Sequence, residues 1–137
     1  MSELEKSVIF PKGEPVYEHF TGTAYLEVLT KPDEVSSVLT GNVTFEPCTR
    51  NDCHVHELYQ ILLVTGGRGY YQEEGKPARR LEAGDIVKIP GGVKHWHGAA
   101  RDEWFVHLVV IEGRTEWHEP VSDTDYEKVN SGDYHIP

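Results

Sequence analysis

The chain has little of several features that mark particular classes of protein. Its 137 residues include two cysteines and one methionine, and no apolar run approaches the roughly 20 residues of a membrane-spanning helix. Cys48 and Cys53 lie too close in sequence to form the disulfide framework of a secreted domain, so we interpret them as reduced thiols. The first residues, MSELEKSVIFPKGEP, lack the apolar stretch of a signal peptide. These absences predict a cytoplasmic protein.

Basic residues are also few. Thirteen Lys and Arg residues stand against 23 Asp and Glu residues, which gives a formal net charge of -10. A field of this sign repels phosphate backbones and anionic lipid head groups. The composition therefore argues against nucleic acid and membrane surfaces as partners.

Helical periodicity is weak, and short apolar runs alternate with turn residues. We predict strands at 20–29, 42–46, 60–65, 69–72, 86–89 and 105–111. The run at 60–65 is expected to end at Gly66 and Gly67. Short strands at this spacing predict an all-β sandwich or barrel, and 137 residues fit one domain. One helix is expected at 122–129, with Ser122 as its N-cap.

Histidine is abundant, with eight residues, and its placement is the most informative feature. His54 and His56 lie two residues apart, so in a strand both imidazoles face the same side. Gln60 follows after a short turn, and a strand with a Pro/Gly turn leads to His95. Three imidazoles and one amide oxygen would bind a divalent first-row metal, with positions left for water or substrate.

The same residues resemble the two sequence motifs of the cupin family, a superfamily of small β-barrel metalloproteins. The positions that fit the motif spacing are His54, His56, Gln60 and Gly67 for the first motif, and Gly84, Pro90, Gly92 and His95 for the second. Three positions depart from the motifs. Cys48 stands where the first motif opens with Gly, Ala99 stands where the second closes with Asn, and Gln60 replaces the usual Glu.

Gln60, together with HWHGAA at 95–100 and FTGT at 20–23, resembles a bacterial subgroup. This subgroup contains the cupins found with carboxymuconolactone decarboxylases and the manganese-dependent cupin hydroxynitrile lyases. The resemblance implies a single cupin domain over 1–137, a barrel of two facing antiparallel sheets. Its core would span about 41–112, with an N-terminal arm and strand at 1–30 and a C-terminal tail at 113–137.

The resemblance also implies a metal centre and an assembly. The metal ligands would be His54, His56, Gln60 and His95. One divalent ion is expected per chain, with Mn²⁺ favoured and Zn²⁺, Ni²⁺ or Fe²⁺ behind it. A homodimer is expected as well, because an open barrel edge invites pairing with a second chain.

His107 lies within the apolar run 105–111 and must have a partner or stay neutral. The resemblance implies that it is a general base, and the alternative is a core histidine bonded to another side chain. The resemblance leads us to expect a Gln in those lyases where this chain has Ile111. We expect His97 behind the metal site or at its rim. Cys48 is expected to be a small buried residue, and the alternative is a reactive thiol.

Together with these residues, the resemblance implies a metal-dependent enzyme that acts on a small polar organic substrate by lyase or decarboxylase-like chemistry. Hydroxynitrile lyase is the most specific form of this prediction. Four neutral ligands leave the metal charge uncompensated, so the centre should favour an anionic ligand. Two alternatives remain open: a cupin dioxygenase, and a non-catalytic sensor that binds a small ligand.

Overall fold

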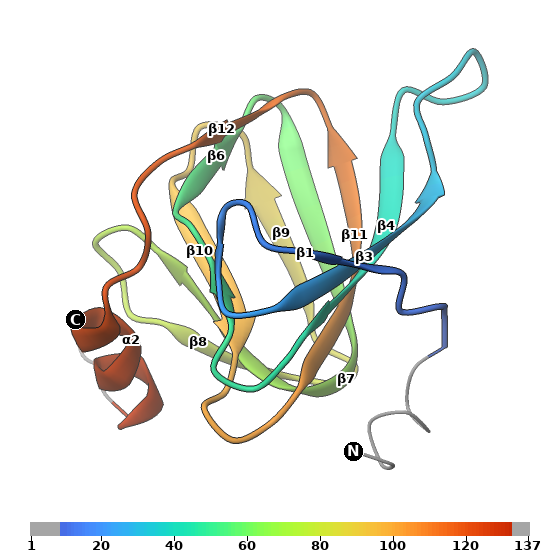
Figure 1. The fold of residues 1–137 in the computed structure, drawn as a ribbon. Helices are drawn as coiled ribbons and strands as arrows, with labels where there is room; N and C mark the ends of the chain where they lie inside the picture. Colours follow the sequence, from blue (N-terminus) through green and yellow to red (C-terminus); the bar gives the residue numbers. More distant parts are fainter. Residues whose placement is uncertain (1–8, 133–137) are drawn as a thin grey trace.

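The computed structural model describes residues 9–132, and they form a β-barrel (Figure 1). The elements are β1 (Glu14–Val16), β2 (Phe20–Thr21), β3 (Ala24–Thr30), β4 (Leu39–Phe45), β5 (Arg50–Asn51), β6 (His54–His56), β7 (Tyr59–Glu73), β8 (Arg79–Glu82), β9 (Ile86–Pro90), β10 (His95–Ala99), β11 (Phe105–Glu112), β12 (Thr115–Trp117) and α2 (Asp123–Asn130). Strands dominate, which confirms the prediction of an all-β barrel.

The long strand β7 belongs to both faces of the barrel. Its first half pairs with β11 and β9, and its second half pairs with β10 and β8. On the first face the order continues from β11 through β4 and β3 to β1. On the second face β10 also pairs with β5 and β6, and β6 pairs with β12. All these pairs are antiparallel, so inward-facing residues of both faces meet in one interior.

The prediction that the strand at 60–65 ends at Gly66 and Gly67 is wrong. The strand continues to Glu73, and Gly67 has φ 72, a conformation that glycine adopts without strain. A Cβ at this position would lie 1.9 Å from the carbonyl oxygen of Trp104. Gly67 therefore marks the corner at which β7 passes from one face of the barrel to the other.

The predicted strand at 20–29 is also divided by a glycine. Gly22, at φ 100, separates β2, which pairs with β5, from β3, which pairs with β4. Six further strands, β1, β5, β6, β8, β10 and β12, lie outside the predicted ranges. They are short, and none carries an apolar run from which a strand could be inferred.

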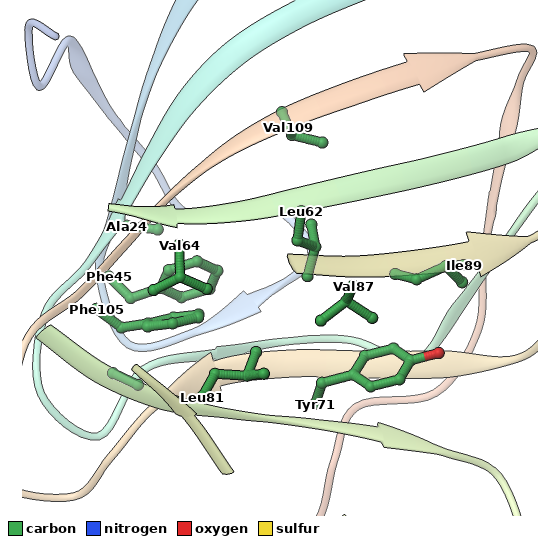
Figure 2. Packing of buried hydrophobic residues seen from close by; sticks show 11 residues of the cluster. Ala24, Phe45, Leu62, Val64, Tyr71, Leu81, Val87, Ile89, Phe105 and Val109 are labelled. Carbon is green, nitrogen blue, oxygen red and sulfur yellow. The ribbon is translucent and has the colours of Figure 1, made fainter. Parts of the chain in front are cut away.

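The apolar core fills the space between the two faces (Figure 2). It consists of Ala24, Phe45, Leu62, Val64, Tyr71, Leu81, Val87, Ile89, Ala99, Phe105 and Val109. The Phe45 ring lies between this core and the histidines, since its centroid is 5.6 Å from that of Phe105 and 5.5 Å from that of His107. The core thus packs directly against the polar interior described below.

The predicted C-terminal helix is confirmed as α2. Ser122 is its N-cap, and the Ser122 hydroxyl accepts a hydrogen bond from the backbone N–H of Asp125 at 3.1 Å. The helix packs outside the barrel, where the Tyr126 hydroxyl donates to the carbonyl of Ala99 at 2.6 Å. Within residues 9–132, no helix has the length and apolar character needed to cross a membrane.

Candidate metal centre

Three of the predicted ligands come together because β6 and β10 are neighbours. His54 and His95 are paired in register, and His56 lies two residues along β6 on the same side. The ring centroids are 4.2 Å apart for His54 and His95, and 4.9 Å apart for His54 and His56. Each of the three side chains is 1% exposed. The two sequence motifs therefore meet inside the barrel, although about 40 residues separate them.

Gln60, the fourth predicted ligand, lies at the start of β7. Its Oε1 lies 2.6 Å from Nε2 of His56 and 3.2 Å from Nε2 of His95. The turn that joins β9 to β10 is bonded to the strand that carries His56, because the N–H of Gly92 donates to the carbonyl of His56 at 3.0 Å. The structure thus places His54, His56, Gln60 and His95 around one point.

The Nδ1 atoms of the three histidines point away from the centre and have hydrogen-bond partners there. Nδ1 of His54 donates to the carbonyl of Asp52 at 2.7 Å, and Nδ1 of His95 donates to the carbonyl of Val93 at 2.9 Å. Nδ1 of His56 lies 3.0 Å from the hydroxyl of Thr115. Because a carbonyl only accepts, the proton of the neutral ring of His54 and of His95 is on Nδ1. Nε2 therefore directs its lone pair into the centre, as in a metal-binding histidine.

Burial keeps these rings neutral. It lowers the pKa of His54 to about 2, with a further contribution from neighbouring His95. It lowers the pKa of His95 to about 4, and it also lowers that of His56. Since the neutral imidazole is the form that binds a metal, the centre is ready for a cation across the neutral pH range.

The donor set fits a divalent metal. The amide oxygen of Gln60 and the unprotonated Nε2 of His95 are both hydrogen-bond acceptors, and they lie 3.2 Å apart in a buried site. Two lone pairs in this arrangement repel, and a cation between them would turn the repulsion into binding. Three imidazole nitrogens and one amide oxygen suit first-row ions.

His97 is buried next to this group, so of its two expected positions, behind the metal site or at its rim, the rim is wrong. Its side chain is 3% exposed, and it offers a ring nitrogen within 4.8 Å of those of His54 and His95. Its backbone N–H donates to Oδ1 of Asn51 at 2.9 Å. The signal was present in the sequence, because His95 and His97 are two apart and share one face of β10.

The position of His107 fits both predicted roles, that of a general base and that of a core histidine. The side chain is fully buried, and Nδ1 donates to the carbonyl of Leu108 at 3.1 Å. Its Nε2 lies 3.3 Å from Nδ1 of His97, so it has the side-chain partner of a core histidine. It also lines the cavity in front of the centre, as a base would. Burial lowers the pKa of His107 to about 4.

A cavity of about 420 Å³ extends from the centre toward the β1–β2 turn and β12. Apolar side chains form much of its wall, among them Leu26, Val43, Val109 and Ile111. The polar groups at its inner end are the rings of four histidines, His54, His56, His97 and His107, together with Gln60 and Asn51. The size and the contrast between walls and inner end are typical of a small-molecule site.

The two cysteines lie outside this interior. Cys48 is exposed, so the expectation of a buried residue is wrong, and its φ of 71 explains why the first motif has glycine there. Cys53 packs against the outer cluster that contains Trp96 and Tyr126. Both thiols are free.

Comparison with known proteins gives consistent findings. The profile of the Cupin_2 family, described as "Cupin domain", matches residues 41–112. An (R)-mandelonitrile lyase of Granulicella tundricola is 38% identical over 113 residues, which cover 80% of this chain and 86% of that protein.

Solved structures with the same fold include a cupin-like protein from Thermotoga maritima, with a TM-score of 0.88 and 41% identity. The match covers 91% of this chain and 98% of that one. A predicted oxalate decarboxylase from the same organism has a TM-score of 0.66 at 19% identity, covering 75% of this chain and 95% of the other. At that identity the likeness shows a shared fold alone.

Proposed function

The chain belongs to the cupin family, and on this basis we propose that it is a metal-dependent enzyme acting on a small polar organic molecule. The metal ligands would be His54, His56, Gln60 and His95. One observation carries the proposal. Gln60 Oε1 and two Nε2 atoms converge on a buried point, while backbone carbonyls hold Nδ1 of His54 and His95 from behind.

A bound divalent cation would supply Lewis-acid polarisation of a substrate oxygen. The four ligands carry no charge, so the centre should hold a carboxylate, hydroxide or other anionic group more strongly than a centre with a Glu ligand. We favour Mn²⁺, on the resemblance to manganese-dependent cupin lyases, with Zn²⁺, Ni²⁺ and Fe²⁺ behind it. The availability of each metal would determine which ion is bound, because intrinsic affinity at an imidazole site favours nickel or zinc over manganese.

His107 is the candidate for proton transfer. At neutral pH it is uncharged, because burial lowers its pKa to about 4. Its Nδ1 proton is committed to the carbonyl of Leu108, so Nε2 is free to accept a proton from His97 or from a substrate in the cavity. The inner end of the cavity thus combines a metal-binding face with a proton acceptor.

The named relative supports a lyase. An (R)-mandelonitrile lyase with 38% identity makes mandelonitrile the first compound to test, followed by small hydroxy and keto acids. Ile111 lines the cavity where the resemblance leads us to expect a Gln in those lyases, so the preferred substrate should differ from theirs.

The test is turnover by metal-loaded protein compared with metal-stripped protein and with His54→Ala. We expect conversion of at least one compound that disappears on stripping and in the variant. An oxygen electrode run in parallel separates the alternatives, since oxygen consumption would indicate a dioxygenase. Ligand-induced thermal stabilisation without conversion of any compound would contradict an enzyme and indicate a binding protein.

A further inference from the structure

Trp117 connects the outer surface to the metal centre. It ends β12, which lies beside β6 (Figure 1). In this strand pair Trp117 stands opposite His54. The indole centroid is 4.7 Å from that of the His54 ring, and the side chain is 36% exposed. Trp117 also lines the 420 Å³ cavity. Trp117 therefore forms part of the cavity wall and contacts the ring of His54, one of the proposed metal ligands.

The indole is held by a second aromatic ring. His19, in the turn between β1 and β2, stacks on Trp117 with centroids 4.3 Å apart and ring planes 2° apart. Stacking at this distance fixes the plane of the indole, because each ring restricts the rotation of the other. The N-terminal turn thus determines how Trp117 faces the cavity.

His19 is itself fixed in an uncommon conformation. Its φ is 69, in the left-handed region that few residues other than glycine adopt. The N–H of Asp52 donates to the carbonyl of His19 at 2.8 Å, and the Asp52 carboxylate lies 3.6 Å from Nδ1 of His19. The carbonyl of the same Asp52 accepts from His54. A strained residue held by several contacts beside a site suggests a role in that site.

We propose that Trp117 determines the specificity of the cavity and that His19 is its positioning residue. The ligand would carry a flat apolar group, which contacts the indole, beside a polar group directed to the histidines. The apolar walls and the polar inner end of the cavity match this division. The proposal rests on the cavity being the substrate site of the proposed function.

The variants distinguish the effect of the His19 ring from that of its left-handed backbone conformation. His19→Asn deletes the stacking ring but keeps a residue that tolerates the left-handed conformation. His19→Tyr restores a ring. Trp117→Leu removes the indole, and Trp104→Leu is the matched control, because Trp104 lies outside the cavity lining. Equal unfolding midpoints identify the variants that remain folded.

The measurement is an NMR titration of zinc-loaded and metal-free protein with benzamide and with acetamide. The two carry the same amide group, on a phenyl ring in benzamide and on a methyl group in acetamide. We expect benzamide to bind at least about tenfold more tightly than acetamide. The ratio should fall about three- to tenfold in Trp117→Leu and His19→Asn, and stay unchanged in His19→Tyr and Trp104→Leu.

An unchanged ratio in Trp117→Leu and His19→Asn would overturn the proposal, and so would a wild-type protein that binds both amides equally. Because the comparison is also made without metal and without turnover, failure of the proposed enzyme function leaves its result interpretable.

Discussion

At the residue scale, the centre depends on atoms that would not touch the metal. Each of the three proposed ligand histidines is oriented through Nδ1, by the carbonyl of Asp52 or of Val93, or by the hydroxyl of Thr115. The two carbonyls belong to the backbone and survive any substitution. The hydroxyl of Thr115 is the one such partner that a point mutation can remove.

Thr115→Val should therefore weaken metal binding. The substitution keeps the shape of the side chain but leaves Nδ1 of His56 without its partner at 3.0 Å. We expect the affinity for Zn²⁺ to fall about 10- to 100-fold, measured by competition with a chromogenic chelator. Thr40→Val is the control, because the Thr40 hydroxyl bonds to Thr30 on the surface. Equal affinities in both variants would show that Thr115 does not orient the ligand.

The buried histidines should make the metal-free protein sensitive to acid. In the unfolded chain His107 takes a proton near its ordinary pKa of 6.5, but in the fold burial lowers its pKa to about 4. Between these values the unfolded state binds more protons, so stability is full above about pH 6.5 and declines as the pH falls toward 4. Urea unfolding at pH 7, 6 and 5 checks this. His107→Gln should show a smaller decline, and a decline equal to that of the wild type would contradict the assignment to His107.

At the element scale, two glycine corners shape the barrel. The apolar runs predicted the longer strands, and the spacing of His54, His56, Gln60 and His95 predicted side chains that the structure brings close together. Local pattern could not show that β7 passes through Gly67, since a turn glycine and a corner glycine look the same in sequence. That distinction depends on which distant strands pair on either side.

The same limit applies to the site. The sequence identified the convergent histidines because strand geometry makes residues two apart neighbours. It could not identify Trp117, Thr115 or His19, because their contacts join segments that are remote in the chain. The strand that carries the first two is three residues long and has no apolar alternation.

Gly67→Ala should be strongly destabilising. The added Cβ would lie 1.9 Å from the Trp104 carbonyl oxygen, in addition to the strain of a φ of 72. Gly75→Ala has a similar φ of 79 but nothing within 4 Å, so it measures the strain alone. We expect a loss of about 1 kcal/mol for Gly75→Ala and more than about 3 kcal/mol for Gly67→Ala, by urea unfolding. Equal losses would mean that the corner relaxes around a side chain.

At the scale of the whole molecule, the two faces of the barrel differ on the outside. The helix α2 packs on the outer side of the second face, where Tyr126 contacts β10. On the first face, β11 and β7 carry apolar side chains outward as well as inward. The outward residues that stay partly or fully exposed are Ile61, Leu63, Ile86, Leu108 and Val110. Antiparallel strands that face water normally carry polar residues there.

We infer that a second copy of the chain covers this face. Glu27 on β3 and Lys88 on β9 lie at opposite borders of the patch, so a two-fold axis along the strands would bring opposite charges together. Leu63→Glu should convert a dimer into a monomer in sedimentation equilibrium. Val35→Glu, at a residue 89% exposed in the β3–β4 loop, should leave the dimer intact. A monomeric wild type would contradict the inference.

The central claim is that His54, His56, Gln60 and His95 hold a metal ion. Elemental analysis of the purified protein, beside a His54→Ala/His95→Ala variant, tests it most directly. We predict close to one divalent ion per chain in the parent, with manganese favoured, and none retained by the variant. A parent that takes up no ion after incubation with manganese, zinc, nickel or iron would contradict the claim.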